Sequence, residues 1–253
     1  MTQQEALQQY LLRLADSDMV LGQRLCELCG HAPALEEELA LMNLGLDLIG
    51  QARNWYEYAA ELEGKGNDAD YLAFRRDAGE FRNLLLVEQP NGDYAMTMAR
   101  QFFFDAWHYQ TLQALVNSSD ERIAQVAGKA IKEVTYHLRR SIEWMKRLGN
   151  GTEESHQRME VAVEELWRFT GELIEADEVD LMMAEAGIGA DPEAVKSAWK
   201  QMVTDVMTEA TLTLQDENAW MHVGGKRGIH TEHLGFLLAE MQFLPRAYPD
   251  AVW

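Results

Sequence analysis

Positive charge, cysteine, proline and long apolar runs are all scarce in this sequence. Its 253 residues hold 22 Lys+Arg against 42 Asp+Glu, a formal net charge of -20 that repels nucleic-acid phosphates and anionic lipids. No apolar run approaches the roughly 20 residues that a membrane-spanning helix needs. We therefore expect no nucleic-acid partner and no membrane partner. The N-terminus lacks a basic stretch followed by an apolar one, which predicts a cytoplasmic protein.

The two cysteines, Cys26 and Cys29, are spaced as CxxC and have His31 nearby. Zinc normally takes four protein ligands, and a thioredoxin-like motif follows a β-strand. Neither context is present here. Because reduced cysteine is among the most buried residue types, we predict that both thiols serve only in packing.

Strand signals are nearly absent, whereas apolar residues recur at steps of three and four, which predicts an all-α protein. Helices are expected at about 3–28, 33–63, 92–117 and 119–148, and further helices at about 152–175, 178–188, 191–213 and 231–245.

The segment 64–91 is longer than a hairpin loop and contains a short amphipathic stretch, so it predicts one crossover between two helix pairs. One such crossover is the arrangement of a ferritin-like four-helix bundle. No Pro/Ser-rich linker follows the bundle. We therefore expect a single domain over 1–253, in which a core bundle at about 3–148 is covered by packed C-terminal helices at about 152–245.

Each of the four long helices has an apolar seam with a polar residue near its middle. Asp18 to Leu48 spans 30 residues and Asp105 to Val134 spans 29, so a hairpin of nearly constant length occurs twice. We therefore expect the seam midpoints to face one another inside the bundle. These midpoints are Asp18, Leu48 with Gln51, Asp105, and Val134 with His137.

That layout is the layout of a di-iron centre, in which two helices give one Glu each and two give Glu-x-x-His. Such a centre needs carboxylates to bridge and neutralise two cations. Here Leu48 and Val134 stand where the motif glutamates belong, Gln51 replaces one histidine, and the two other acids are aspartates. We therefore predict vestigial ligand positions, with no bound metal and no catalytic residue in this chain.

Two acids lie one residue before the missing glutamates, Asp47 on the second helix and Glu133 on the fourth. One residue turns a helical side chain by about 100°, away from the seam. Each acid does lie four residues before the polar midpoint of its own helix, and such residues can share a face. Leu48 and Val134 would still fill the space between two metal ions, so we do not expect a rescued site.

Other interpretations of the polar midpoints stay open. Asp18, Asp105 and His137 could serve an atypical metal-dependent oxidase, or they could be core residues in Asp-His or Asp-Gln pairs or bound to a trapped water. A storage or binding protein would need a cavity in the bundle core, which bulky side chains on the seams disfavour.

Four long segments resemble the C subunits of bacterial ring-1,2-phenylacetyl-CoA epoxidases, multicomponent oxygenases of aerobic phenylacetate degradation. They are DLIGQA at 47–52, FRNLLLVEQPNGDYAMTMARQFFFDAW at 81–107, KEVTYHLR at 132–139 and KRGIHTEHLGFLLAEMQ at 226–242. The similarity covers nearly the whole chain.

The resemblance implies a ferritin-like fold and a non-catalytic, structural role. In that family the A subunit has the di-iron site and binds the CoA thioester, and a reductase subunit supplies electrons. The C subunit is a degenerate paralogue that holds the A subunit in a stable complex. The resemblance therefore implies that no cofactor is bound in this chain and that the catalytic A subunit is its partner.

Three further features remain. Lys226 and Arg227 in GGKRG predict a solvated loop, with contact to a CoA phosphate or an acidic partner as the alternative. Thr231 is expected as a helix N-cap, with His230 and His233 on the surface. A surplus of aromatic and methionine residues predicts core packing, with a partner-facing patch as the alternative: Trp167, Phe169, Met182, Met183, Trp199, Met202 and Met207.

Overall fold

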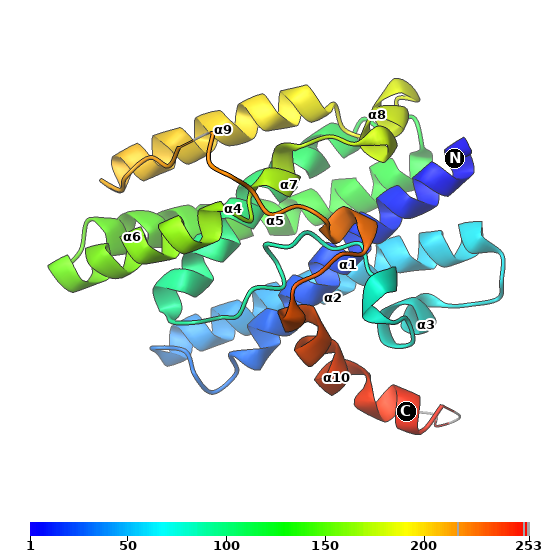
Figure 1. The fold of residues 1–253 in the computed structure, drawn as a ribbon, viewed down its shortest axis with the longest axis horizontal. Coiled ribbons are helices and arrows are strands. Elements are labelled where there is room, and N and C mark those ends of the chain that lie inside the picture. Colours follow the sequence, from blue (N-terminus) through cyan, green and yellow to red (C-terminus); the bar gives the residue numbers. More distant parts are fainter. Residues whose placement is uncertain (217, 250, 252–253) are drawn as a thin grey trace. The chain divides into compact units, whose positions relative to one another are not determined.

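The computed structural model describes residues 1–216, 218–249 and 251. Throughout this part of the chain the regular elements are helices and no β-strand occurs, which confirms the all-α prediction (Figure 1). The set of helices is consistent with a ferritin-like bundle that carries additional helices. None of the described helices is long and apolar enough to cross a bilayer.

The chain divides into two compact units. The first unit combines Met1–Pro90 with Gly224–Trp253, and the second is Asn91–Val223. The expectation of a single domain over 1–253 stays a prediction. Each unit is built around one of the two long helical hairpins that the sequence predicts.

The hairpin of the first unit consists of α1 (Gln3–Glu27) and α2 (Leu35–Glu63). The side-chain oxygen of Thr2 accepts a hydrogen bond from the Glu5 amide, and the Thr2 amide donates to the Glu5 carboxylate, so a capping box starts α1. The two helices approach each other closely at two glycines. A Cβ on Gly22 would lie 3.0 Å from the carbonyl oxygen of Gly45.

The crossover 64–91 contains α3 (Ala69–Phe74) and the short 3-10 helix η1 (Ala78–Glu80). Arg76 after α3 forms an ion pair with Asp16 of α1, and both side chains are buried. The Tyr56 hydroxyl donates to the same carboxylate at 2.6 Å, and the Arg82 amide donates to it at 2.7 Å. A buried carboxylate that is paired and hydrogen-bonded in this way fixes the crossover on the hairpin.

The C-terminal helix α10 (Glu232–Ala247) returns to the first unit and packs on α1, α3 and η1. It follows a short 3-10 helix, η2 (Gly225–Arg227). Gln242 of α10 is buried and donates to the backbone carbonyls of Ala73 and Arg76 at 3.2 and 3.0 Å. Three α10 leucines are buried as well: Leu234, Leu237 and Leu238.

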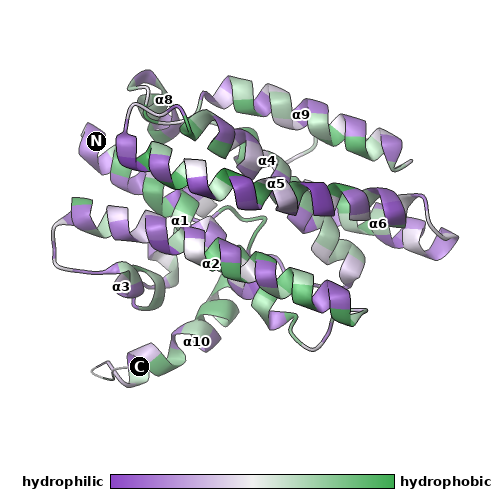
Figure 2. Cartoon of the chain, turned by 180° about the vertical axis from the view of Figure 1, so that it is seen from behind, coloured by the Kyte–Doolittle hydropathy of each residue, from purple (hydrophilic) through white to green (hydrophobic). Residues whose placement is uncertain are grey.

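The hairpin of the second unit consists of α4 (Tyr94–Leu115) and α5 (Glu121–Gly149). Polar and apolar residues alternate along α5 with helical spacing, as its colouring in Figure 2 shows. The remaining helices of this unit are α6 (Glu153–Trp167), α7 (Gly171–Ile174), α8 (Glu178–Glu185) and α9 (Pro192–Glu209). Asp191 caps α9 and Pro192 is its first residue.

The prediction of one helix over 152–175 is wrong, because the chain breaks between α6 and α7. The amide of Thr170 bonds the carbonyl of Trp167 at 3.0 Å, and the Thr170 hydroxyl donates to the same oxygen at 2.8 Å. The next residue, Gly171, lies against Met221, whose Cβ would be 2.8 Å from a Cβ at position 171. Local hydrogen bonds of Thr170 thus accompany the end of α6, and the start of α7 lies in close contact with a distant segment.

Two other helices end earlier than predicted. Gly187 has a φ of 68°, so the helix expected over 178–188 ends at Glu185. Thr211 has a φ of 57°, a left-handed conformation that ends the helix expected to reach residue 213.

Candidate functional site

The second unit holds two of the predicted ligand positions, Asp105 on α4 and His137 on α5, and both side chains are fully buried. One oxygen of Asp105 accepts a hydrogen bond from the Gln101 side-chain amide at 2.7 Å. Its other oxygen accepts from the Ser141 hydroxyl at 2.8 Å. Protein donors on α4 and α5 thus engage both oxygens of this carboxylate.

Burial is the largest influence on the pKa values of Asp105 and His108. It raises the pKa of Asp105 to about 6, although the charge of His137 and the two hydrogen bonds favour the ionised form. Burial, together with the charge of His137, lowers the pKa of His108 to about 3, so His108 is neutral. Arg140 also favours the ionised form of Asp105, and its guanidinium donates to the Tyr94 hydroxyl at 3.0 Å.

Ser141 lies four residues after His137 and so on the same face of α5, but its bond to Asp105 was not predicted. An Asp-His or Asp-Gln pair across the seam, or a trapped water, was expected, whereas the glutamine that bonds Asp105 belongs to the same helix. Whether Asp18, Gln51 and His137 pair across the seam stays a prediction. The spacing of four residues between Gln101 and Asp105 is the signal that could have revealed this bond.

The first unit holds the other two midpoints, Asp18 on α1 and Gln51 on α2, and both are buried. Leu48, at the glutamate position of α2, is 0% exposed, and so is Trp55 one turn after Gln51. The predicted burial of all four polar midpoints is therefore confirmed. That the midpoints of the two hairpins share one level stays a prediction.

The donor set does not fit a di-iron pair. Leu48 and Val134 occupy the positions from which bridging glutamates would come, both are 0% exposed, and neither has a ligand atom. Asp105 already accepts two hydrogen bonds from protein donors. Asp47 and Glu133 are only partly buried, as expected for residues turned away from the seam.

Another buried carboxylate, Glu88, lies in the first unit at the end of the crossover. It accepts hydrogen bonds from the His230 Nδ1 at 2.9 Å, from the amide and hydroxyl of Thr231 at 2.7 and 2.8 Å, and from the Asn83 side chain at 2.9 Å. This cluster was not predicted, because nothing in the local sequence around Glu88 indicates a partner 142 residues away.

The expectation of a surface histidine at position 230 is wrong, because the His230 side chain is only 5% exposed. Burial by itself would lower its pKa, but the hydrogen bond and charge of Glu88 outweigh burial and raise the pKa overall. Thr231 occupies the N-cap position of α10 as predicted, although its hydroxyl bonds Glu88 instead of the helix. His233 is partly buried.

Comparisons with known proteins identify the family. A family model described as "Phenylacetic acid catabolic protein" matches residues 1–253. The chain belongs to this family. A curated relative, the C subunit of the 1,2-phenylacetyl-CoA epoxidase of Escherichia coli strain K12, is 55% identical over 244 residues, which cover 96% of this chain and 98% of the relative. The resemblance found in the sequence is therefore confirmed.

Two smaller predictions on single residues have mixed outcomes. Lys226 is partly buried and Arg227 is exposed in the short turn η2, so the loop prediction holds and their contact with CoA or a partner stays untested.

Both thiols are free, but Cys29 is exposed and Cys26 only partly buried. The packing prediction is wrong for Cys29, since α1 ends at Glu27 and turns the following residues toward solvent.

Most of the surplus aromatic and methionine residues contribute to the core of the second unit. Met183, Trp199 and Met207 are at most 1% exposed. The others are partly buried: Trp167, Phe169, Met182 and Met202. Core packing is thus confirmed for the first three.

Proposed function

We propose that this chain is a non-catalytic, structural subunit of a phenylacetyl-CoA 1,2-epoxidase complex, which acts in the cytoplasm in aerobic phenylacetate degradation. Its role is to stabilise the catalytic A subunit, which has the di-iron centre. A reductase subunit supplies the electrons. The relative at 55% identity, itself named as the C subunit of such an epoxidase, supports this assignment.

The observation that carries the non-catalytic role is the chemistry at the glutamate positions. Oxygen activation at two irons needs bridging carboxylates, and this chain has buried Leu48 and Val134 in their place. Asp105 is the carboxylate among the vestigial ligand positions of the second unit, and it accepts hydrogen bonds from Gln101 and Ser141. Both oxygens of Asp105 therefore have protein donors, as expected of a core carboxylate that binds no metal.

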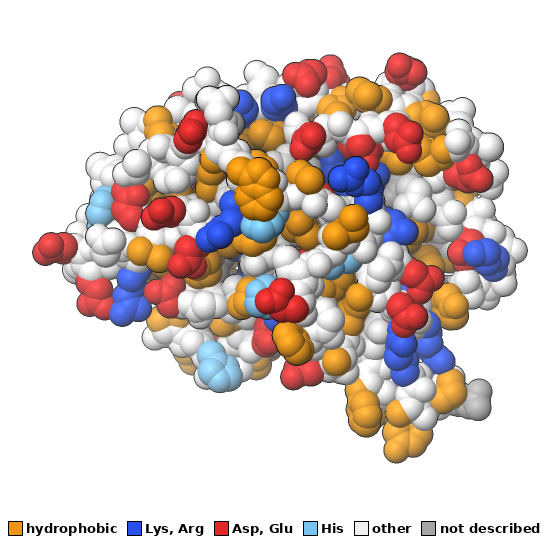
Figure 3. Space-filling model, in the orientation of Figure 1, with side chains coloured by type: hydrophobic (Ala, Val, Ile, Leu, Met, Phe, Trp, Pro, Cys, Tyr) orange, Lys and Arg blue, Asp and Glu red, His pale blue; other side chains and the backbone are white. Residues whose placement is uncertain are grey.

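Exposed apolar side chains support a role in assembly. Phe236 and Phe243 on α10 are 69% and 65% exposed, and Tyr248, the residue that follows the helix, is 60% exposed. Hydrophobic atoms gather over the end of this helix in Figure 3. Contiguous exposed apolar patches are typical of protein interaction sites, and obligate interfaces commonly bury more than about 2,000 Å².

Co-expression tests the proposal. The catalytic subunit produced alone should be poorly soluble or inactive, and co-expression with this chain should restore soluble, active complex when the other components are supplied. A variant in which Asp18, Asp105 and His137 are all replaced by leucine should still restore it, because restoration depends on surfaces and not on these polar groups. His137→Leu alone is the milder variant if the triple variant fails to fold, and complex activity should stay within a few-fold of wild type.

Two results would contradict the proposal. One is full activity of the catalytic subunit in the complete absence of this chain, at equal solubility. The other is metal analysis of the purified chain that finds close to two irons per molecule with oxygen-dependent turnover, which would favour the metal-dependent oxidase instead.

A further inference from the structure

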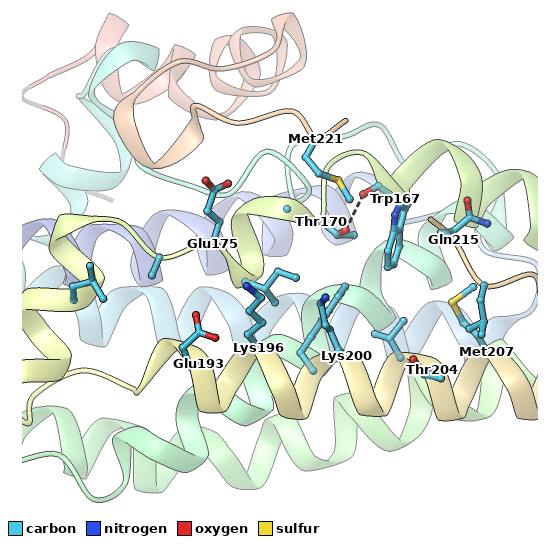
Figure 4. A pocket seen from close by; sticks show the side chains of 17 residues that line it. Trp167, Thr170, Glu175, Glu193, Lys196, Lys200, Thr204, Met207, Gln215 and Met221 are labelled. Carbon is cyan, nitrogen blue, oxygen red and sulfur yellow. Dashed lines mark hydrogen bonds between the residues drawn. The ribbon is translucent and has the colours of Figure 1, made fainter. Parts of the chain in front are cut away.

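The second unit contains a pocket that the proposed structural role does not use (Figure 4). Its volume is about 620 Å³, within the range of sites that hold small organic ligands. The pocket lies among α9, α7 and the end of α6. Its lining includes Trp167, Trp199, Lys196, Lys200, Met207 and Met221.

Two tryptophans give the pocket a rigid apolar wall. The rings of Trp167 and Trp199 are stacked, with centroids 6.0 Å apart and planes 26° from parallel. The indole nitrogen of Trp199 donates to the carbonyl of Phe103 at 3.0 Å, and that of Trp167 donates to the carbonyl of Asp216 at 3.0 Å. Because the backbone satisfies both N–H groups, both rings are held in place. Trp199 is only 1% exposed and supports Trp167 from behind, so the partly buried ring of Trp167 is the one that can contact a ligand.

Two lysines bring positive charge to the same pocket. Lys196 and Lys200 are one turn apart on α9, and in Figure 4 their side chains extend from α9 toward α7. Both are partly buried. Among the residues that the structure describes, Lys196 has no ion-pair or hydrogen-bond partner. The three N–H donors of its ammonium group can therefore bind a ligand.

Two acids, Glu175 and Glu193, also line the pocket, but their position differs from that of the lysines. Both are exposed, whereas Lys196 and Lys200 are partly buried. In Figure 4 the carboxylate of Glu175 points away from α9. The positive charge of the lysines is therefore less exposed to solvent than the negative charge of the two acids. The pocket thus has a local positive charge in a chain whose net charge is -20.

We propose that this pocket binds a small organic anion with an apolar body, a carboxylate of the fatty or aryl acid type. Its carboxylate lies beside the ammonium groups of Lys196 and Lys200, and its apolar body lies against the ring of Trp167, which Trp199 supports from behind. A neutral apolar ligand would bury the ammonium group of Lys196 without a partner, and a cationic ligand would face two like charges. This site is separate from the vestigial ligand positions and does not depend on the structural role.

Isothermal titration calorimetry on the full chain tests the proposal with two matched pairs of probes. Octanoate and 2-naphthoate represent the aliphatic and aromatic acids, and octanamide and 2-naphthamide are their uncharged counterparts. At least one acid should bind one-to-one, and at least tenfold more tightly than its amide. If one acid binds more tightly than the other, the result shows whether the pocket prefers an aliphatic or an aromatic ligand.

Three variants separate the site from nonspecific binding. The double variant Lys196→Gln with Lys200→Gln should weaken acid binding at least tenfold. The same charge change at the exposed Lys129 and Lys132 of α5 should leave it unaltered. Thr204→Trp, at an exposed residue of the pocket lining, should block binding while keeping both lysines.

The proposal is overturned if neither acid binds at millimolar concentration, or if acid and amide bind equally. Equal weakening by the α9 and α5 lysine variants would also overturn it. Circular dichroism of each variant confirms that binding is compared between folded proteins.

Discussion

At the scale of the residue, Asp105 is a carboxylate kept in an apolar helical core by two neighbours. Gln101 and Ser141 donate to its two oxygens, yet burial still raises its pKa to about 6 from a reference value of 3.8. The folded protein therefore binds a proton between these two pH values that the unfolded chain has released. The contribution of Asp105 to the free energy of unfolding therefore decreases as the pH rises from about 4 to about 6, and it stays low at higher pH.

Asp105→Asn should therefore stabilise the protein at pH 8, because the amide removes the buried charge and its oxygen still accepts a hydrogen bond. A shift of this size corresponds to at most about 3 kcal/mol, and the lost attraction to His137 and Arg140 will reduce the gain. The gain should disappear near pH 4, where the wild-type carboxyl is protonated in the folded state. Urea unfolding of both proteins at pH 4 and pH 8 measures it. A destabilised variant at pH 8 would contradict the argument.

The polar midpoints of the helices were predictable because they interrupt an apolar repeat that the sequence displays directly. Gln51, Asp105 and His137 are buried where the seams place them. His230 was not predictable in this way. Its burial depends on Glu88, 142 residues earlier in the chain, and a pattern read along one helix carries no information on such a contact.

At the scale of the element, the Glu88–His230 pair attaches the start of α10 to the end of the crossover. Asp16 adds a further favourable charge, and Arg24 donates to the backbone carbonyl of Glu88 at 2.8 Å. The pKa of His230 is raised in the folded protein. Its contribution to stability is fully present below the unfolded-state pKa and is lost as pH rises through the folded-state pKa.

His230→Gln should therefore cost more stability at pH 6 than at pH 9, since only protonated His230 makes an ion pair with Glu88. The free energy of unfolding in urea, measured at both pH values, gives the comparison. His31→Gln is the matched control, because His31 is an exposed histidine of the same unit. An equal loss at both pH values would show that the imidazole acts only by packing.

The ends of the four long helices were predictable to within about two residues, because capping and turn residues mark them. Thr2 before α1 and Gly64 after α2 are such signals. The break after α6 was not predicted; there the Thr170 hydroxyl bonds the carbonyl of Trp167, and Met221 from a distant segment packs against Gly171. Helix existence thus follows from local chemistry, and helix interruption can depend on tertiary contacts.

At the scale of the molecule, the first unit draws on both ends of the sequence, whereas the second is one continuous segment. The α10 helix supplies buried leucines and the Gln242 hydrogen bonds to the crossover. Burying each leucine contributes about 1.5–3 kcal/mol, so three of them match much of the roughly 5–15 kcal/mol that stabilises a typical domain.

Leu234→Ala should therefore destabilise the protein by about 2–5 kcal/mol, since Leu234 is 0% exposed. Phe236→Ala on the same helix is the matched control, because Phe236 is 69% exposed and its loss should change stability by less than about 0.5 kcal/mol. Urea unfolding of the isolated chain measures both. Similar costs at the two positions would show that α10 does not contribute to the core as described.

The return of α10 to the first unit also bears on how the protein is made. Arg24 and the backbone of His233, which are hydrogen-bonded at 3.1 Å, are 209 residues apart in the sequence. At synthesis rates of about 5–20 residues per second, a ribosome needs roughly 10–40 s to cover that interval. During that time the nascent N-terminal hairpin and crossover lack the helix that covers them, and their apolar surface is open to chaperones or to aggregation.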